Sequence, residues 1–331
     1  MRLAPDQPLI NVILIAVGLY FLLKGSGWFV DAVVFIARKF EVSEMVIGLT
    51  LVSIGTSLPE LAANVYASAT GEAGVSLGNV VGSNITNITL ILGVGAMYAS
   101  VIPIPKSLLK RDSLILLIVY FVFIYLCRYS GLEQDNFLLR FEGIILLLFF
   151  VVYLFILIKN KDVIHEETDG EHHSDFIKSF SRALLFFIIG FLMIIFGAKL
   201  AVDNVVSIAN HLNISKEIIS GTIIAFGTSV PELAVTVISI KRGKHNLALG
   251  NIIGSCIFNI ILVMGVAIVI QPLKVSLVMN NVLLPLMLFS AGLMILFMRF
   301  GMKIVRWQGG VLSLLYILYI AYNLKQILLK F

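Results

Sequence analysis

Apolar stretches separated by short polar loops follow one another along the whole chain. Ten of these stretches are long enough to cross a bilayer, since a transmembrane helix needs about 20 predominantly apolar residues. They lie near residues 9–38, 43–69, 75–100, 113–129, 137–158, 178–209, 215–240, 246–271, 278–298 and 306–328. The pattern predicts an all-α polytopic membrane protein with ten transmembrane helices.

A long segment of the chain occurs twice. Residues 25–93 and 197–265 align without a gap at an offset of 172, and 29 of the 69 positions are identical. Equivalent points therefore lie five predicted spans apart, an odd number, so the two halves must have opposite orientations in the membrane. We expect two inverted five-helix repeats, at 9–158 and 178–329, joined by a linker at 159–177.

Composition agrees with a membrane protein. Hydrophobic residues make up 59% of the chain and charged residues 13%, whereas an average soluble domain has about 25% charged residues. The net charge of +5 is scattered over several loops, without a basic stripe or interleaved aromatic residues, so it does not indicate a nucleic-acid surface. Cys127 and Cys256 fall in predicted spans and have no metal-ligand spacing.

Basic residues in the loops predict the orientation, because they are enriched on the cytoplasmic side. Loops after spans 1, 3, 5, 7 and 9 carry 15 Lys and Arg, and the opposite side, with both termini, carries seven. We expect a protein of the cell (plasma or inner) membrane with both termini outside and the linker in the cytoplasm.

The linker at 159–177 is the one sustained polar segment. It contains His165, His172 and His173 among several acids, a composition that could suit a metal sensor. The spacing is irregular and the segment has few hydrophobic residues to order it, so a solvated, mobile connector is the preferred interpretation. Asp31 and Asp203 match across the repeat near span ends, and we expect them to cap helices or pair with loop cations rather than bind transported ions.

Two motifs within the repeats carry the candidate chemistry. Gly-Thr-Ser-(Leu/Val)-Pro-Glu occupies 55–60 and 227–232, and Gly-Asn-X-X-Gly-Ser occupies 78–83 and 250–255. Small residues in spans often serve only for helix packing, but packing gives no reason for an acid in each half. A carboxylate inside an apolar span is costly and usually marks an ion or substrate path. Glu60 and Glu232 are therefore expected to form one site at the repeat interface.

Pro59 predicts a break in the second span. It has no N–H to donate to the Gly55 carbonyl, and its ring strains the preceding turn. Irregular backbone at membrane depth is tolerated where it lines a cavity or binds something. The carbonyls around 52–55 then become available as ligands.

The two motifs together offer oxygen ligands. These are the carboxylates, amides and hydroxyls of Glu60, Glu232, Asn87, Asn259, Thr56, Ser57, Ser83, Thr228, Ser229 and Ser255. Such ligands suit Ca²⁺, which takes 6–8 oxygens, and also Na⁺, whereas Zn²⁺ and Cu prefer nitrogen and sulfur. No cofactor is expected, and the ions are the transported substrates.

At these motifs the chain resembles the cation/calcium exchanger superfamily, and within it the sodium/calcium exchangers of prokaryotic type. The resemblance runs from about Gly25 to the last span, with α-repeats at Gly48–Gly93 and Ser220–Gly265. It implies ten helices in two inverted repeats, with ions bound between helices 2, 3, 7 and 8. The proton-coupled branch places an acid soon after the Gly-Asn pair, where this chain has two apolar residues in each copy.

The resemblance also implies roles for particular residues. Glu60 and Glu232 would be central ligands, and Ser83 and Ser255 would line flanking sodium sites. The other implied ligands are the side chains of Thr56, Ser57, Asn87, Thr228 and Ser229 and the carbonyls of Ser53 and Ala225. At Asn259 many relatives have Asp, a difference that bears on ion stoichiometry and on any participation of K⁺.

These observations predict a secondary active antiporter, not an enzyme, that exchanges Ca²⁺ for Na⁺ by alternating access. An H⁺/Ca²⁺ antiporter and a potassium-dependent sodium/calcium exchanger are the alternatives. A channel would use similar oxygens, but a doubled broken-helix motif favours alternating access. An intramembrane hydrolase lacks a visible nucleophile–base pair. The expected partners are Ca²⁺, Na⁺ and the lipid bilayer, with no nucleic acid and no obligatory protein partner visible.

Overall fold

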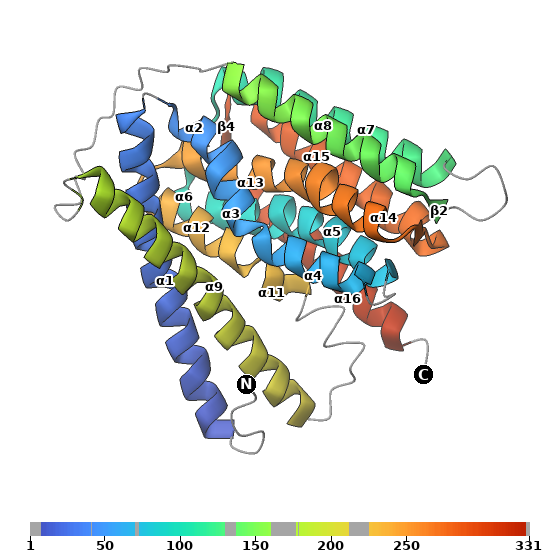
Figure 1. Ribbon diagram of the computed structural model, residues 1–331, viewed down its shortest axis with the longest axis horizontal. Helices are drawn as coiled ribbons and strands as arrows, with labels where there is room; N and C mark the ends of the chain where they lie inside the picture. The colour runs from blue at the N-terminus through green and yellow to red at the C-terminus, as the bar shows by residue number, and fades with distance from the viewer. Residues whose placement is uncertain are drawn as a thin grey trace.

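The computed structural model of the chain consists almost entirely of helices (Figure 1). It describes residues 8–40, 42–69, 73–129, 137–159, 177, 179–211 and 225–328. The predicted linker at 159–177 therefore lies almost wholly outside the described residues, as does the first part of the span predicted at 215–240.

The first half contains helical segments at the five predicted positions. They are α1 (Pro8–Lys39); the run α2 (Glu44–Ile47), η1 (Gly48–Val52), α3 (Ser53–Thr56) and α4 (Leu58–Ala69); the run α5 (Ala73–Thr86), η2 (Asn87–Ile91) and α6 (Leu92–Ala99); η3 (Leu108–Asp112) with α7 (Ser113–Tyr129); and α8 (Arg140–Lys159). The segments labelled η are π-helices.

The second half repeats this order. Its segments are α9 (Phe180–His211); α11 (Ala225–Thr228) with α12 (Val230–Lys241); the run α13 (His245–Phe258), η5 (Asn259–Met264) and α14 (Gly265–Ile270); η6 (Met279–Leu283) with α15 (Leu284–Arg299); and α16 (Arg306–Leu328). Short strands complete the structure: β1 (Val101–Pro103), β2 (Phe137–Leu138), β3 (Leu273–Lys274) and β4 (Lys303–Val305).

The described helices include many that could cross a membrane. Seven segments are long and apolar enough to do so, and the bent pair Glu44–Thr56 and Leu58–Ala69 adds an eighth if it is one span. The chain is thus a multi-pass helical membrane protein. The prediction of ten spans remains a prediction.

Local irregularities recur at the repeat offset. Two pairs of π-helices are related by about the same separation as the sequence motifs: η2 with η5, and η3 with η6. Each pair of strands joins the two halves of the chain. β1 of the first half pairs antiparallel with β4 of the second half, and β2 of the first half pairs antiparallel with β3 of the second half. β4 and β2 lie toward opposite ends of the molecule in Figure 1. The two halves therefore share backbone features as well as sequence motifs.

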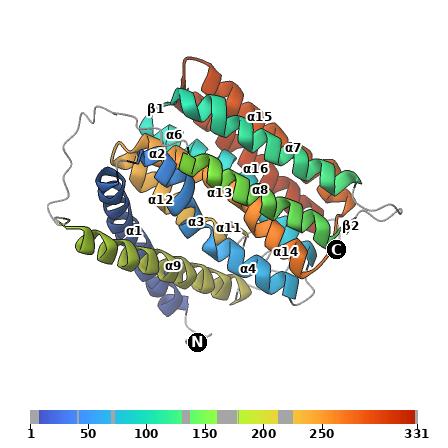
Figure 2. The ribbon, with the colours of Figure 1, turned by 45° about the horizontal axis from the view of Figure 1, so that its top comes forward.

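α1 and α9 lie side by side, apart from the main group of helices (Figures 1 and 2). Glycines allow their close approach, because a Cβ at Gly190 would lie 2.8 Å from the Gly25 carbonyl oxygen. Phe29 of α1 and Phe187 of α9 stack at a ring-centroid distance of 4.8 Å. The first helices of the two halves thus form a packed pair.

The central helices carry the second motif. In the spans Ser76–Ala99 and His245–Ile270, 83% of the most apolar window is buried inside the protein, against 44% or less for the other spans that pass as single helices. Burial singles these two out as inner helices, surrounded by neighbours rather than facing lipid. At Gly254 a Cβ would lie 2.5 Å from the Ser53 hydroxyl oxygen, so the inner helix α13 contacts α3 closely.

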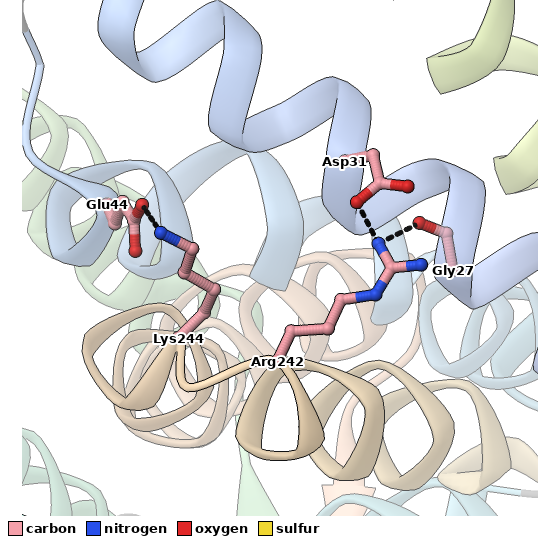
Figure 3. A network of polar contacts seen from close by, with 5 residues as sticks. All are labelled: Gly27, Asp31, Glu44, Arg242 and Lys244. Carbon is pink, nitrogen blue, oxygen red and sulfur yellow. Dashed lines mark hydrogen bonds and ion pairs between the residues drawn. The ribbon is translucent and has the colours of Figure 1, made fainter. Parts of the chain in front are cut away.

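Charged side chains join the halves at one end of α1 and α2 (Figure 3). Arg242, in the turn between α12 and α13, donates to the Asp31 carboxylate and to the Gly27 carbonyl oxygen, the latter at 2.7 Å. Lys244 pairs with Glu44 at 2.9 Å. The expectation that Asp31 pairs with a loop cation is confirmed. Asp203 is exposed, in α9.

Candidate functional site

The predicted break in the second span is present and is repeated in the second half. Ser57 leaves the helical conformation at φ −85° and ψ 5°, and the flanking segments differ in direction by 44°. Ser229 adopts nearly the same conformation, with φ −90° and ψ 4°. Each break is followed by a new helix whose first turn contains a glutamate, Glu60 or Glu232. The positive end of the helix dipole therefore lies at each carboxylate.

The two breaks face each other and exchange hydrogen bonds. Ser57 donates to Glu232 at 3.0 Å, and Ser229 donates to Glu60 at 3.2 Å. Both glutamates are fully buried, and both serines are almost so. Since each serine belongs to the half opposite its glutamate, the two motifs contact each other between the halves.

Two asparagines that were not among the candidate ligands complete the reciprocal pattern. Thr56 donates to Asn251 at 3.1 Å, and Thr228 donates to Asn79 at 3.4 Å. Asn251 also donates to Thr236 at 3.1 Å. The sequence could have identified Asn79 and Asn251 as site residues, because both belong to the Gly-Asn pair that matches across the repeat.

Several polar atoms at this site are buried without a partner among the described residues. They are Glu60 Oε2, Glu232 Oε2, Asn87 Oδ1 and Nδ2, Asn259 Oδ1 and Ser255 Oγ. Unpaired buried polar groups are uncommon in proteins, and a bound ion is one reason for them. The unpaired atoms of the two carboxylates and of Asn259 are oxygens, which fit a hard cation.

π-helices begin at both predicted amide ligands. Asn87 is the first residue of η2, and Asn259 is the first residue of η5. A π-helical turn inserts an extra residue into the helical repeat and is frequent at functional sites. Both amides are almost fully buried, at 1% and 0% exposure.

The remaining predicted residues lie in the same segments. Ser83 is buried, with its hydroxyl 3.2 Å from that of Ser229. Ser53 is also buried, and its carbonyl oxygen already accepts the Ser57 N–H at 3.0 Å. Ala225 is the first residue of α11. Thr228 is half-buried. Direct coordination by Ser53 and Ala225 remains a prediction.

The ligand chemistry of the site is that of a hard cation. The described residues include no group of three or more His, Cys, Asp and Glu side chains that could hold a metal ion. The grouped atoms here are carboxylate, amide and hydroxyl oxygens, which suit Ca²⁺ and Na⁺. Two ionised carboxylates supply a charge of −2, enough to balance one divalent cation.

A helical membrane protein in which two buried carboxylates and several other oxygens meet between repeated halves has the features of a cation transporter. Comparison with known proteins identifies its family. The model of the sodium/calcium exchanger protein family matches residues 10–159 and 182–325. The chain belongs to the sodium/calcium exchanger family. It is a membrane-embedded calcium/cation exchanger by this membership.

Individual relatives are similar over most of their length. The sodium/calcium exchanger MaX1 of Methanosarcina acetivorans is 35% identical, over 94% of this chain and 97% of MaX1. The inner membrane protein YrbG of Escherichia coli is 33% identical, over 80% of this chain and 81% of YrbG. A solved structure of the sodium-calcium exchanger NCX_Mj, soaked with 10 mM Na⁺ and zero Ca²⁺, has a TM-score of 0.82 at 36% identity. That match covers 95% of this chain and 99% of NCX_Mj.

Proposed function

We propose that the chain is a secondary active antiporter that exchanges Ca²⁺ for Na⁺ across the cell membrane by alternating access. The observation that carries this proposal is the reciprocal Ser57–Glu232 and Ser229–Glu60 contact, with one unpaired oxygen left on each buried carboxylate. Two buried carboxylates are suited to hold either one Ca²⁺ or a small group of Na⁺. The similarity to MaX1, which is named a sodium/calcium exchanger, supports the same ions.

The proposed ligands come from four of the predicted spans, the second, third, seventh and eighth. Glu60 and Glu232 provide the charge, and Asn87 and Asn259 provide neutral amide oxygens at the starts of the π-helices. The hydroxyls of Thr56, Ser57, Thr228 and Ser229 and the carbonyls of Ser53 and Ala225 complete the central set. Ser83 and Ser255 line flanking sodium sites.

The proposed membrane arrangement is ten spans in two inverted five-helix repeats, at 9–158 and 178–329. The strand pairing supports it, because β1 with β4 joins the loops after spans 3 and 9, and β2 with β3 joins the loops after spans 4 and 8. Loops predicted to lie on the same side thus meet each other. In transporters built from inverted repeats, alternating access follows from movement of one repeat or bundle against the other around a fixed site.

Na⁺ is the proposed counter-ion, and neutral groups around the glutamates are the reason. Ser83, Asn87, Ser255 and Asn259 are fully or almost fully buried and uncharged, so they can distribute several monovalent cations around two carboxylates. H⁺ still inhibits transport, because protons and metal ions compete for Glu60 and Glu232. An H⁺/Ca²⁺ antiporter and a K⁺-dependent exchanger remain the alternative outcomes of the test.

The test uses purified protein in proteoliposomes. Vesicles loaded with Na⁺ and diluted into Na⁺-free buffer should accumulate radioactive Ca²⁺ without a pH gradient and without K⁺. Uptake that requires an imposed pH gradient would identify a proton-coupled exchanger, and uptake that requires K⁺ would identify the potassium-dependent class.

Replacing either glutamate should abolish this uptake. Glu60→Gln and Glu232→Gln keep the side-chain volume but remove half of the negative charge, so both variants should fall to the background of empty vesicles. Glu142→Gln is the matched control, because Glu142 accepts the Leu139 N–H at an exposed helix start and glutamine can still accept it. Wild-type uptake by either site variant would contradict a shared two-carboxylate site.

A further inference from the structure

Asn84 is a buried polar residue in the inner helix α5 that the ligand set does not use. It follows Ser83 of the Gly-Asn-X-X-Gly-Ser motif, but the repeat does not preserve it: the equivalent position in the second half is Cys256. A fully buried amide on an inner helix is costly unless its hydrogen bonds are made. Its partners therefore indicate why it is there.

The amide of Asn84 bonds directly to a predicted ligand. Asn84 Oδ1 accepts a hydrogen bond from Asn259 Nδ2 at 3.3 Å. The other end of the Asn84 amide, Nδ2, donates to the thioether sulfur of Met287 at 3.9 Å. The sulfur can only accept, so it favours the orientation in which the Asn84 oxygen faces Asn259. Asn259 in turn presents its own oxygen on the side away from Asn84.

The orientation of Asn259 matters because an amide has two electrostatically opposite ends. Its Oδ1 is fully buried and has no partner among the described residues. Presented to a cation, that oxygen is a ligand, whereas a reversed amide would present two N–H donors and repel the cation. The hydrogen bond from Nδ2 to Asn84 holds the amide in the attractive orientation.

Asn87, the equivalent amide of the first half, is not held in this way. Neither Asn87 Oδ1 nor Asn87 Nδ2 makes a hydrogen bond of normal length among the described residues, and the side-chain neighbour of this amide is the thiol of Cys256. By the repeat, the residue that corresponds to Asn84 is Cys256, and a thiol is only a weak hydrogen-bonding group. The two amide ligands therefore differ in how firmly they are oriented.

We propose that Asn84 is a positioning residue that holds the Asn259 amide with its oxygen toward the ion site and thereby sets the affinity of the site for Ca²⁺. The inference rests on the proposed function for the identity of the ion. A carboxylate at position 259 would not need this help, because both of its oxygens are acceptors. Asn84 is thus specifically matched to an asparagine at 259.

The experiment is a double-mutant cycle read out by Ca²⁺ binding to the purified protein in detergent, with calorimetry. Asn84→Ala should weaken Ca²⁺ binding about tenfold, since about 1.4 kcal/mol corresponds to a factor of ten. In an Asn259→Asp background, Asn84→Ala should leave the Ca²⁺ affinity within about twofold of that of Asn259→Asp alone. The reason is that a carboxylate presents an oxygen to the cation in either orientation. A loss that is equal in both backgrounds would show a packing role and overturn the proposal, as would an unchanged affinity of Asn84→Ala itself.

A second variant does not alter Asn84. Met287→Leu keeps a buried apolar side chain but removes the sulfur acceptor, so it should weaken Ca²⁺ binding in the wild-type background and not in Asn259→Asp. Equal affinities of Met287→Leu and the wild type would contradict the role assigned to Met287. Asn280→Ala is the control for truncating a buried asparagine elsewhere, in η6, and should bind Ca²⁺ normally.

Measuring Ca²⁺ binding and Na⁺-driven Ca²⁺ uptake separately distinguishes a failure of this inference from a failure of the proposed function. If the wild type binds Ca²⁺ but Na⁺ gradients drive no uptake, Na⁺/Ca²⁺ exchange fails while the cycle still tests Asn84. If the wild type exchanges the ions and Asn84→Ala matches it in affinity and in the Ca²⁺ concentration for half-maximal uptake, the role of Asn84 fails alone. The expected result is a raised half-maximal concentration with a largely preserved maximal rate.

Discussion

Ser57 and Ser229 connect the two halves of the chain through hydrogen bonds. Each donates a hydrogen bond to a glutamate of the opposite half, and each is also the residue at which its own helix breaks. A hydrogen bond to a charged group contributes about 1.5–3 kcal/mol. Losing one of these serines therefore removes both a potential ligand and the group that orients a carboxylate.

At the residue scale we expect Ser57→Ala and Ser229→Ala to weaken Ca²⁺ binding by similar factors of about ten or more, as 1.4 kcal/mol is a factor of ten. The measurement is calorimetric titration of the purified variants. Ser26→Ala is the control, because the Ser26 hydroxyl donates to the Leu22 carbonyl oxygen of its own helix at 2.7 Å. If only one of the two site serines matters, the two halves do not contribute symmetrically to the site.

At the scale of elements, the packing of α13 against α3 depends on a glycine. A Cβ at Gly254 would lie 2.5 Å from Ser53 Oγ and 2.9 Å from the backbone of Leu49, a contact that only a shift of the helices could relieve. We expect Gly254→Ala to lower the thermal midpoint and to reduce Ca²⁺ uptake, since overpacking costs about 1–3 kcal/mol. Gly292→Ala in α15 is the matched control, because no described atom beyond the adjacent backbone of its own helix lies within 4 Å of its Cβ position. A Gly254→Ala protein as stable and active as Gly292→Ala would contradict the close contact.

The ion pairs beside α1 and α2 are a second contact between elements. Arg242 joins the turn before α13 to Asp31 and Gly27 of α1. Arg242→Gln should destabilise the protein by about 1 kcal/mol, the upper end of the range for partly exposed pairs, and the difference should shrink in high salt. Lys241→Gln removes the same charge from the adjacent, exposed position and should change the midpoint less. Equal midpoints for the two variants in a thermal-unfolding assay would show that the Arg242 contacts contribute no stability.

At the scale of the whole molecule, the proposed orientation makes a prediction about accessibility. Leu277 and Phe300 are 75% and 62% exposed and flank the predicted span 278–298 at opposite ends. With both termini outside, Phe300→Cys faces the cytoplasm and Leu277→Cys faces the exterior. In intact cells an impermeant thiol reagent should label Leu277→Cys and not Phe300→Cys, which should react only after permeabilisation. Native Cys127 and Cys256 are buried and should stay unlabelled. The reverse labelling pattern would overturn the orientation.

The sequence by itself determined the local features of this protein. Apolar length predicted where the helical segments lie, and Pro59 predicted a break in the second span, because a missing N–H and a steric clash act within one helical turn. The structure places that break at Ser57, and an equivalent break at Ser229. The cost of burying a carboxylate singled out Glu60 and Glu232. The family could be recognised from the same short motifs.

Only the tertiary structure decided which polar groups meet. The periodicity of a helix predicts the face on which a side chain lies, but not which residue of a distant helix lies opposite, since that depends on how the whole bundle packs. The serine–glutamate exchange, the Thr56–Asn251 bond and the Asn84–Asn259 bond all join residues about one repeat apart in the chain. Asn84 illustrates the difference: in the sequence it is a polar residue that follows the Gly-Asn-X-X-Gly-Ser motif, and in the structure it accepts a hydrogen bond from Asn259, a candidate ligand of the opposite half.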